Sequence, residues 1–310
     1  MNDVDYDLVI IGGGPAGLTA GLYAARARLN TILFEKITPG GQVLVSDWIE
    51  NYPGFPEGIN GADLVQKMTE HVKKFDLNIE TNEVISFDFS NQIKKIKLND
   101  RIIKTHAVII ATGASPKKLG VPGEETFYGK GVSFCATCDG PFFKDLVLAA
   151  VGGGDTAVQE TLFLTKFAKK VYLIHRRNKL RANKSLQERT FANKKIEIVW
   201  DSVVSGIQGL SNVEEISVTN VKTGDIKNLH VDGCFIWVGI NPNTQFIGNS
   251  VVLDETGFVI ADLNMETSVP GVFAAGDVRN TPLRQITTSV GDAAIAVASA
   301  EHYIENITTR

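Results

Sequence analysis

Cysteine is scarce in this sequence: its 310 residues include only Cys135, Cys138 and Cys234. Three thiols are too few for a disulfide-rich scaffold, and they favour a reducing compartment. We therefore expect a cytoplasmic protein. Long apolar runs are also lacking, because no stretch approaches the roughly 20 residues that a membrane-spanning helix needs. The net charge of −4 leaves no basic excess for nucleic acid or anionic lipid. We therefore expect neither nucleic-acid nor membrane binding.

Glycine, in contrast, is plentiful and gathers in two similar segments, 7–36 and 146–177. In each segment a strand-like apolar run leads through glycines into a helical pattern and then a second apolar run. This is the context that a dinucleotide fingerprint requires, with glycines for a tight turn, for close approach of the pyrophosphate and for helix–strand packing. The three fingerprint positions are filled by Gly12, Gly14 and Gly17 in the first copy and by Gly152, Gly154 and Ala157 in the second.

The tails of the two copies are alike as well, with turn-punctuated strand patterns at 84–105 and 203–231. We therefore predict an α/β fold with two Rossmann-like dinucleotide-binding domains, each a parallel sheet with a small antiparallel β-meander. The second domain is inserted in the first. The expected boundaries are 1–115 and 246–310 for the discontinuous first domain and 116–245 for the second. A long helix from about Gln285 to Ile304 is expected to close the chain.

The copies differ where an adenosine ribose is expected. Eighteen residues beyond the third fingerprint position lies Glu35 in the first copy and His175 in the second. A carboxylate there accepts the ribose hydroxyls, whereas basic side chains accommodate a 2′-phosphate. We interpret His175, Arg176 and Arg177, with Arg181 a turn later, as a cationic fork for a phosphate monoester. The sequence thus favours FAD in the first domain and NADPH in the second, although "HRRNKLR" also fits a solvated charge run.

The stretch "FCATCDG" raises the question of what Cys135 and Cys138 do. Zinc needs four ligands, and the five histidines supply no closely spaced pair to complete a site. A structural disulfide across so short a loop would constrain the unfolded chain little. A redox pair is the remaining interpretation, with Gly131 and Gly140 allowing the backbone to approach a flat ring. Cys234, within an apolar run, is expected to be a buried core thiol.

Asp139 directly follows the pair, and its position fits two interpretations. It could be the acid that protonates a leaving thiolate or the reduced flavin. It could equally be a helix N-cap.

Nearly end to end, the chain resembles the low-molecular-weight, bacterial-type thioredoxin reductases, which are class II pyridine nucleotide-disulfide oxidoreductases. Related flavoproteins share the nucleotide motifs but not "CATCDG" in this position. The motifs that carry the resemblance are "IIGGGPAG", "PGGQ" (39–42), "ENYPG" (50–54), "IIATGA", "CATCDG", "GGGDTA", "HRRNKLRA", "GVFAAGD" and "LRQI" (283–286).

The resemblance implies an enzyme, an NADPH-dependent thioredoxin-disulfide reductase that works as a homodimer. Reducing equivalents would pass from NADPH through FAD and the Cys135–Cys138 disulfide to oxidised thioredoxin, with Asp139 as the acid and with rotation of one domain against the other. The implied FAD contacts are Gly12, Gly14, Pro15, Ala16, Gly17, Glu35, Lys36, Gly40, Gly41, Gln42, Asn51, Thr112, Gly113, Gly276, Asp277, Arg284, Gln285 and Ile286. The implied NADPH contacts are Gly152, Gly154, Asp155, Thr156, Ala157, His175, Arg176, Arg177 and Arg181, and no metal is expected.

Two kinds of alternative stay open at this point. One is a related flavoprotein reductase that serves a glutaredoxin-like or peroxidase partner, or a ferredoxin-fed relative. The other is not an enzyme but a flavin-bearing redox sensor, whose cysteines would regulate binding without turning over.

Overall fold

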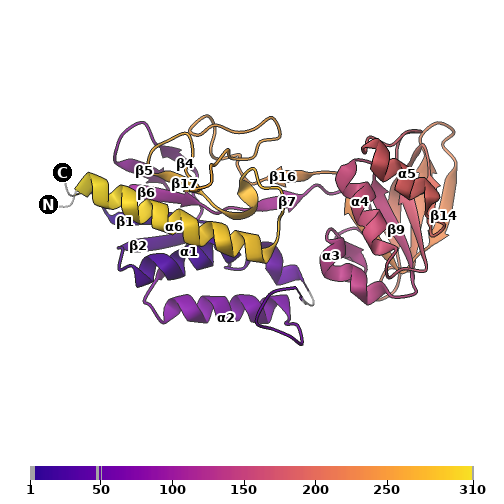
Figure 1. Ribbon diagram of the computed structural model, residues 1–310, viewed down its shortest axis with the longest axis horizontal. Coiled ribbons are helices and arrows are strands. Elements are labelled where there is room, and N and C mark those ends of the chain that lie inside the picture. The colour runs from indigo at the N-terminus through magenta and orange to yellow at the C-terminus, as the bar shows by residue number, and fades with distance from the viewer. Residues whose placement is uncertain (1–3, 47–48, 50, 309–310) are drawn as a thin grey trace. The chain divides into compact units, whose positions relative to one another are not determined.

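The computed structural model describes residues 4–46, 49 and 51–308, so Glu50 of the "ENYPG" motif lies outside the described residues. The chain forms two compact units (Figure 1). The first unit consists of Met1–Ser115 and Asn241–Arg310, and the second is the inserted segment Pro116–Ile240. The chain returns to the first unit a few residues earlier than the sequence analysis placed the crossing.

The first unit is built on one sheet with the strand order β3-β2-β1-β6-β5-β4, in which β17 also pairs with β6. Strands β1, β2, β3, β6 and β17 run parallel, while β4 and β5 are antiparallel additions along β6. The predicted meander of this unit is therefore part of the main sheet. Its elements are β1 (Tyr6–Ile11), α1 (Pro15–Arg26), β2 (Thr31–Glu35), η1 (Gly41–Val45), α2 (Gly61–Lys73), β3 (Asn78–Thr81), β4 (Ser86–Asp88), β5 (Lys94–Lys97), β6 (Ile102–Ile110), β17 (Val272–Ala274), η3 (Gly276–Val278) and α6 (Ile286–Thr308).

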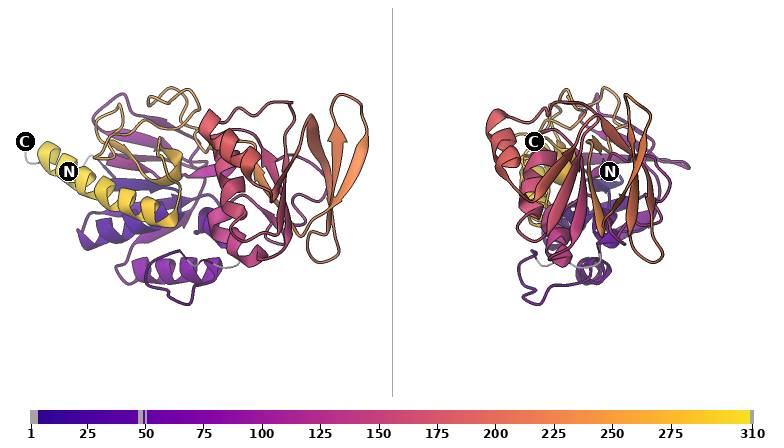
Figure 2. Two further views of the ribbon diagram at one scale, coloured as in Figure 1. Left: turned by 45° about the vertical axis from the view of Figure 1, so that its right-hand side comes forward. Right: turned by 90° about the vertical axis from the view of Figure 1, so that its right-hand side faces the viewer.

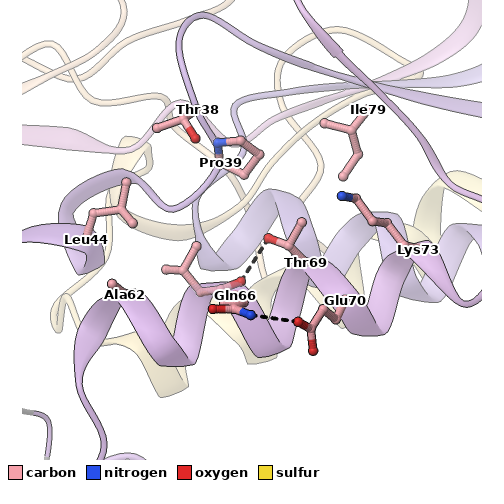
Figure 3. A pocket seen from close by; sticks show the side chains of 10 residues that line it. Thr38, Pro39, Leu44, Ala62, Gln66, Thr69, Glu70, Lys73 and Ile79 are labelled. Carbon is pink, nitrogen blue, oxygen red and sulfur yellow. Dashed lines mark hydrogen bonds between the residues drawn. The ribbon is translucent and has the colours of Figure 1, made fainter.

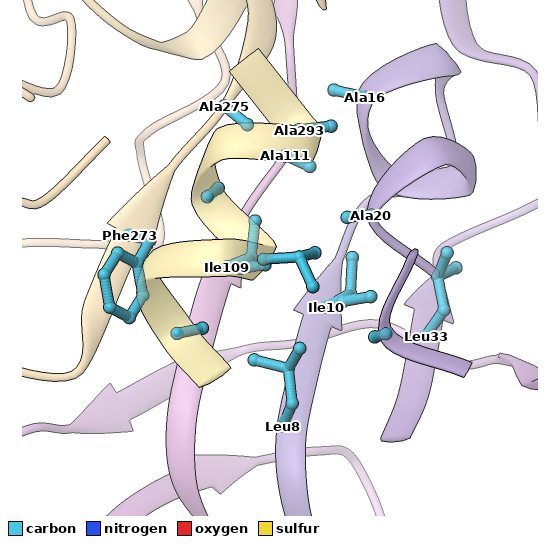
Figure 4. Packing of buried hydrophobic residues seen from close by; sticks show 14 of the residues in the cluster. Leu8, Ile10, Ala16, Ala20, Leu33, Ile109, Ala111, Phe273, Ala275 and Ala293 are labelled. Atoms are coloured by element: carbon cyan, nitrogen blue, oxygen red, sulfur yellow. The ribbon is translucent and has the colours of Figure 1, made fainter. Parts of the chain in front are cut away.

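The central strand β1 is apolar on both faces because both faces are covered, as is usual for parallel sheets. Leu8 and Ile10 pack toward α1 and α6 (Figure 4). Val9 and Ile11 point the other way, into a second core that the sheet shares with residues of the segment before β17, such as Ile247 and Val259. All four side chains are buried, and full burial of such a side chain stabilises a fold by roughly 1.5–3 kcal/mol.

Small residues let α1 and α6 lie close to the sheet and to each other. Ala20 and Ala24 of α1 and Ala293 and Ala296 of α6 are fully buried in the same cluster. Helix α6 confirms the predicted closing helix, although it continues to Thr308. Among the described residues, no helix has both the length and the apolar character needed to cross a membrane.

The second unit repeats the plan with a five-stranded parallel sheet in the order β11-β10-β9-β15-β8. Its antiparallel meander β12-β13-β14 is a separate sheet, drawn in red to orange in Figure 2. The predicted fold class is thus confirmed. The elements of this unit are β8 (Val132–Ser133), α3 (Ala136–Asp139), η2 (Gly140–Phe143), β9 (Val147–Gly152), α4 (Asp155–Leu164), β10 (Lys170–Ile174), α5 (Lys184–Ala192), β11 (Ile196–Val199), β12 (Ser202–Gln208), β13 (Glu215–Asn220), β14 (Ile226–His230) and β15 (Gly233–Trp237).

The two crossings between the units are short strands that pair with each other, β7 (Ala114–Pro116) and β16 (Ile240–Pro242). Asn243 directly follows β16, and its hydrogen bonds hold the β7–β16 pair to residues of the first unit. Its side-chain amide donates to the carbonyl of Thr112 at 2.8 Å, and its own carbonyl accepts from the Thr112 hydroxyl at 2.8 Å. Its side-chain oxygen also accepts from Ser115 Oγ at 3.1 Å.

Candidate active site

The first glycine turn joins β1 to α1 with no room for side chains. Gly12 has a φ of +105°, and a Cβ there would lie 2.5 Å from the carbonyl oxygen of Ala111. A Cβ on Gly17 would overlap the carbonyl oxygen of Gly12, so the third fingerprint position must be glycine here. Helix α1 begins at Pro15 after Gly14, which has no side chain of its own to cap the helix. The backbone N–H groups of this turn are therefore well suited to an anionic ligand.

Glu35 lies at the end of β2 and reaches back to the glycine turn. Its carboxylate accepts hydrogen bonds from the N–H of Gly13 at 2.7 Å and from that of Ile37 at 3.1 Å. Its neighbour Lys36 turns away, because its ammonium pairs with Glu83 at 2.7 Å in an exposed position. The structure thus brings Glu35 to the turn and directs Lys36 elsewhere.

The loop that contains Gly40, Gly41 and Gln42 begins beside the same turn, since the N–H of Gly40 donates to the carbonyl of Gly13 at 2.8 Å. A cavity of about 560 Å³ lies next to this loop, against α2 (Figure 3). Polar side chains of α2 that line the cavity form hydrogen bonds along the helix, as between Gln66 and Glu70 at 2.9 Å. The residues that line the cavity are Thr38, Pro39, Leu44, Ala62, Val65, Gln66, Thr69, Glu70, Lys73 and Ile79, and the predicted contact residues are not among them.

Three further predicted FAD contacts meet near the start of α6. The side-chain amide of Asn51 donates to the side-chain oxygen of Gln285 at 3.0 Å. Gln285 directly precedes α6, whose first residue is Ile286. Thr288 caps this end, because its hydroxyl accepts from the Gln285 N–H at 3.1 Å and donates to its carbonyl at 2.9 Å. The sequence resemblance had assigned these residues separately, and the fold joins them.

The last predicted FAD contacts belong to a half-buried cluster of charges between η3 and α6. Burial raises the pKa of Asp277, and the nearby Arg284 guanidinium counteracts part of that rise. Arg284 lies over the ring of Phe258 at 4.2 Å. Among the described residues, its buried Nε has no hydrogen-bond partner. A bound polar group would satisfy this atom.

Sequence reasoning missed Asp292, which holds the predicted contact Gly276 in place. Its carboxylate accepts from the Gly276 N–H at 3.2 Å and lies 3.5 Å from Nε of the buried Arg279. Burial raises the pKa of Asp292, and the charge of Arg279 lowers it again. Gly276 itself is tightly packed, because a Cβ there would lie 3.0 Å from Cβ of Ala16. Asp292 belongs to no motif and lies 16 residues after Gly276, so the sequence carries no signal for this contact.

The second glycine turn, between β9 and α4, has the same form with one substitution. A Cβ on Gly152 would overlap the Cβ of Ala157, so the small side chain at the third position fills space that glycine leaves open at the first. Helix α4 begins at Asp155, after Gly154. The Asp155 carboxylate accepts from the backbone and side-chain amides of Asn183 at 2.8 and 3.0 Å. Asp155 therefore ties the start of α4 to the start of α5, while Thr156 next to it is exposed.

His175 differs from the expectation of a charged fork. It is only 5% exposed, and its ring packs against Gly153 of the turn, just as Glu35 packs against Gly13. Its Nε2 lies 3.0 Å from the carbonyl of Lys179. Burial lowers the pKa of His175, and backbone hydrogen bonds at Lys179 and Gly152 oppose that shift. The shared register therefore places a buried ring under the turn, in place of an exposed one.

The arginines of the same segment do remain available. Arg176, Arg177 and Arg181 are all exposed. The N–H of Arg181 donates to the carbonyl of Gly153 at 2.7 Å, and its guanidinium lies near the open side of Gly154. Exposed arginines thus lie beside this turn, and Arg181 is anchored to it through the Gly153 carbonyl.

Cys135 and Cys138 form a disulfide at the start of the short helix α3, with a Cα–Cα distance of 5.4 Å. Cys135 is the N-cap residue, and its sulfur accepts from the N–H of Cys138 at 3.2 Å. This bond stabilises negative charge on the Cys135 sulfur once the disulfide is reduced. Asp139 ends α3 and occupies the N-cap position of η2, but its side chain makes no capping hydrogen bond there. Its role as the acid stays a prediction.

Sequence reasoning also missed Ser133 and Tyr128, which surround Asp139. The Ser133 hydroxyl donates to the Asp139 carboxylate at 2.5 Å and accepts from the Cys135 N–H at 3.0 Å. Burial raises the pKa of the Tyr128 phenol, and the negative charge of Asp139 raises it further. Trp237 fixes the intervening backbone by donating to the carbonyl of Phe134 at 3.0 Å. Asp139 thus belongs to a polar cluster that reaches the disulfide.

The third thiol plays no part in this cluster. Cys234 lies in β15 with no exposed surface, and burial raises its pKa to about 12, which confirms the predicted core thiol. Within the described part of the chain, no group of three or more histidine, cysteine or acidic side chains is arranged to hold a metal ion.

The comparisons with known proteins agree with this geometry. The model of the pyridine nucleotide-disulphide oxidoreductase family matches residues 6–300. A thioredoxin reductase from Peptoclostridium litorale is 45% identical over 308 residues, which cover 97% of this chain and 98% of that protein. One from Bacillus subtilis (strain 168) is 44% identical over 303 residues, covering 97% and 96%. The crystal structure of thioredoxin reductase from Streptococcus pyogenes MGAS5005 is 48% identical, with a TM-score of 0.92 and coverage of 97% and 98%.

Two glycine turns on parallel sheets, together with a Cys-x-x-Cys disulfide, define a pyridine nucleotide-disulphide oxidoreductase, and the chain belongs to that family. Within the family it belongs with the low-molecular-weight thioredoxin reductases, to which it is similar over nearly its whole length. Thioredoxin reductases of this family contain FAD and use NADPH.

Proposed function

We propose that this protein is an NADPH-dependent thioredoxin-disulfide reductase, in which the Cys135–Cys138 disulfide passes electrons to oxidised thioredoxin. The observation that carries the proposal is the disulfide itself, formed within a cluster that also holds a carboxylate and a hydroxyl. The same unit carries the second glycine turn and the exposed arginines.

The first unit is the FAD-binding domain of this proposal. Its glycine turn offers backbone N–H groups for the pyrophosphate, and Glu35 is placed at the turn for the adenosine ribose. The unpartnered Nε of Arg284 and the joined pair Asn51–Gln285 would hold the ring system. When bound, FAD supplies the two-electron link between a nicotinamide and a disulfide.

The second unit is the NADPH-binding domain. Gly152 and Ala157 shape a turn that leaves space for a pyrophosphate. Arg176 and Arg181 supply the charge that distinguishes a 2′-phosphate from a free hydroxyl. His175 supports the turn from below, since its buried ring contacts Gly153.

The remaining chemistry belongs to the cysteines and Asp139. Reduction breaks the S–S bond with two electrons, which leaves a thiolate on Cys135, facing the Cys138 N–H, and a thiol on Cys138 that takes its proton from Asp139. The thiolate attacks the partner's disulfide and forms a mixed disulfide, expelling one partner thiolate. Cys138 returns its proton to the Asp139 carboxylate and then attacks Cys135 in turn. The internal disulfide re-forms and the second partner thiolate leaves.

The proposal also includes the cellular compartment and the oligomeric state of the enzyme. We place it in a reducing cytoplasm, because the single thiol outside the redox pair is a buried core residue. We also expect a homodimer, as implied by the resemblance to its family. Analytical ultracentrifugation of the FAD-loaded protein tests the oligomeric state.

A steady-state assay tests the proposed function. NADPH oxidation by the purified FAD-loaded protein should depend on added thioredoxin, and DTNB alone should be reduced only slowly. Replacing either cysteine by serine should abolish the thioredoxin-dependent rate while flavin content stays the same. A protein that reduces its own disulfide with NADPH but never turns over with thioredoxin would instead be a redox sensor. Turnover with a glutaredoxin-like protein alone would assign a different partner.

A further inference from the structure

Ser133 is the residue that connects the acid of the proposed mechanism to the redox pair. It ends strand β8, directly before the segment that carries the cysteines, and is only 4% exposed. Its hydroxyl makes two short bonds at once, donating to Asp139 at 2.5 Å and accepting from the Cys135 N–H at 3.0 Å. One buried hydroxyl therefore links the carboxylate to the backbone of a reacting cysteine.

We propose that Ser133 is a positioning residue for the dithiol–disulfide reaction: it holds the Asp139 carboxyl at the cysteine pair and stabilises its ionised form. This inference rests on the proposed function. The reducing step has the balance S–S + 2e⁻ + Asp139–COOH → S⁻ + SH + Asp139–COO⁻, with the electrons coming from NADPH. A hydroxyl that donates to the carboxylate favours the right-hand side, because it stabilises the charge that Asp139 acquires.

Apolar side chains face the residue that follows Asp139, so the nearest polar neighbours of Asp139 have a strong influence on the charge of its carboxyl group. Helix α3 is followed by Gly140, and the side chains that face this glycine are apolar: Phe163 and Leu164 of α4 and Phe167 just after it. Tyr128 is a titratable group near the carboxyl, because its phenol feels the charge of Asp139.

Glu160 on α4 has its pKa raised by burial alone, so Asp139 is not among the causes of that shift. The Ser133 hydroxyl is a direct hydrogen-bond donor to the Asp139 carboxylate.

The experiment uses the full-length, FAD-loaded enzyme and three variants in a double-mutant cycle, with a fourth variant as a control. Ser133→Ala removes the hydroxyl, Asp139→Asn removes the acid, and the combined variant removes both. The readouts are the single-turnover rate at which NADPH reduces the internal disulfide of the oxidised enzyme, the steady-state rate with thioredoxin, and the rate of iodoacetamide alkylation of the thiols, each measured from pH 5.5 to 9. Ser202→Ala is the control, because Ser202 is a serine of the same unit, 5% exposed, that donates to the carbonyl of Trp200.

We expect Ser133→Ala to slow the single-turnover step about tenfold and to move the Asp139-dependent limb of the pH profile to higher pH. In the Asp139→Asn background the same substitution should change the rate less than twofold, because the group through which Ser133 acts is gone. Equal losses in both backgrounds would mean that Ser133 only shapes the backbone through Cys135, and would overturn the proposal. An unshifted pH profile would overturn it too.

A second pair of variants distinguishes loss of the hydroxyl from misfolding of the Ser133→Ala variant. Ser133→Thr keeps the hydroxyl and Ser133→Val has the same shape without it, and both suit a strand. Threonine should restore the wild-type pH profile, whereas valine should reproduce the alanine result. If the two behave alike, the hydroxyl has no role in positioning Asp139. Should no variant or wild-type enzyme reduce thioredoxin, while the alkylation profiles still differ, the proposed partner is wrong and the role of Ser133 stands.

Discussion

Asn51 and Gln285 are 234 residues apart in the sequence, yet the Asn51 side-chain amide donates to the Gln285 side-chain oxygen at 3.0 Å. Both residues were expected to contact FAD, and their bond makes one polar surface out of two distant motifs. It also ties the segment after η1 to the start of the longest helix, α6, within the first unit.

The pair should therefore act as a unit in FAD binding. We expect Asn51→Ala and Gln285→Ala each to weaken FAD binding about tenfold, and the double variant to be little worse than either. The bond is exposed, so its loss should lower the free energy of unfolding of the apoprotein by only about 0.5–1.5 kcal/mol. Fluorescence titration of apoprotein with FAD measures the affinities. Gln66→Ala, which removes an exposed amide bonded within α2, is the control, and fully additive losses would contradict a shared role.

The arginines at the second glycine turn should decide between the two nicotinamide cofactors. Replacing Arg176 and Arg181 by alanine should lower kcat/KM for NADPH at least tenfold and leave kcat/KM for NADH nearly unchanged, because charge-assisted bonds to a 2′-phosphate are lost. Arg189→Ala removes an exposed arginine from α5 and serves as the control. A preference for NADPH that survives the double substitution would show that these side chains do not read the phosphate.

The buried ring of His175 predicts a loss of stability in mild acid. Its pKa is lowered in the folded state, so below about pH 6.5 the unfolded chain binds the proton more readily and unfolding is favoured. The contribution is present above that pH and is lost as the pH falls, with a slope of at most about 1.4 kcal/mol per pH unit for one group. His175→Asn should flatten the stability profile between pH 7 and 5 in urea unfolding, relative to wild type.

A matched control for that measurement is His230→Asn, because His230 is an exposed histidine of the same unit. It should leave the pH dependence unchanged. If His175→Asn also leaves it unchanged, the ring is protonated in the folded protein after all.

An exposed aromatic ring next to the redox pair predicts a contact with the protein partner. Phe142 lies in η2, four residues after Cys138, and is 47% exposed. Aromatic side chains often dominate protein interfaces, and truncating one commonly costs more than 1 kcal/mol. Phe142→Ala should raise KM for thioredoxin about tenfold without slowing the reduction of bound flavin by NADPH. Phe191→Ala, which truncates a 58% exposed ring on α5, should change neither quantity.

Several parts of the site could be predicted from local pattern, and the reasons are physical. At Gly12 and Gly17 a backbone carbonyl oxygen occupies the space of a Cβ, that of Ala111 and that of Gly12 respectively. The constraint on Gly17 arises within the turn itself, so it is visible in the sequence, whereas the one on Gly12 comes from a residue far along the chain. The alternating apolar faces of β1 and the small residues of α6 likewise reflect burial on both sides of a parallel sheet.

Other features depended on what the fold brings together. The burial of His175 could not be read from the sequence, which shows a basic run, because it depends on packing against Gly153. Asp292 and Ser133 carry no motif of their own. They matter only because one faces Gly276 and the other joins Asp139 to Cys135.

By itself, the sequence determined the fold class, the two dinucleotide turns, the redox cysteines and the family, since each is encoded by residues that act within one strand–turn–helix unit or one short motif. Only the tertiary structure decided which of the nominated side chains are charged, paired or buried, and which unnoticed neighbours support them. Protonation and hydrogen bonding depend on the distance to atoms far along the chain, and a linear sequence does not contain those distances.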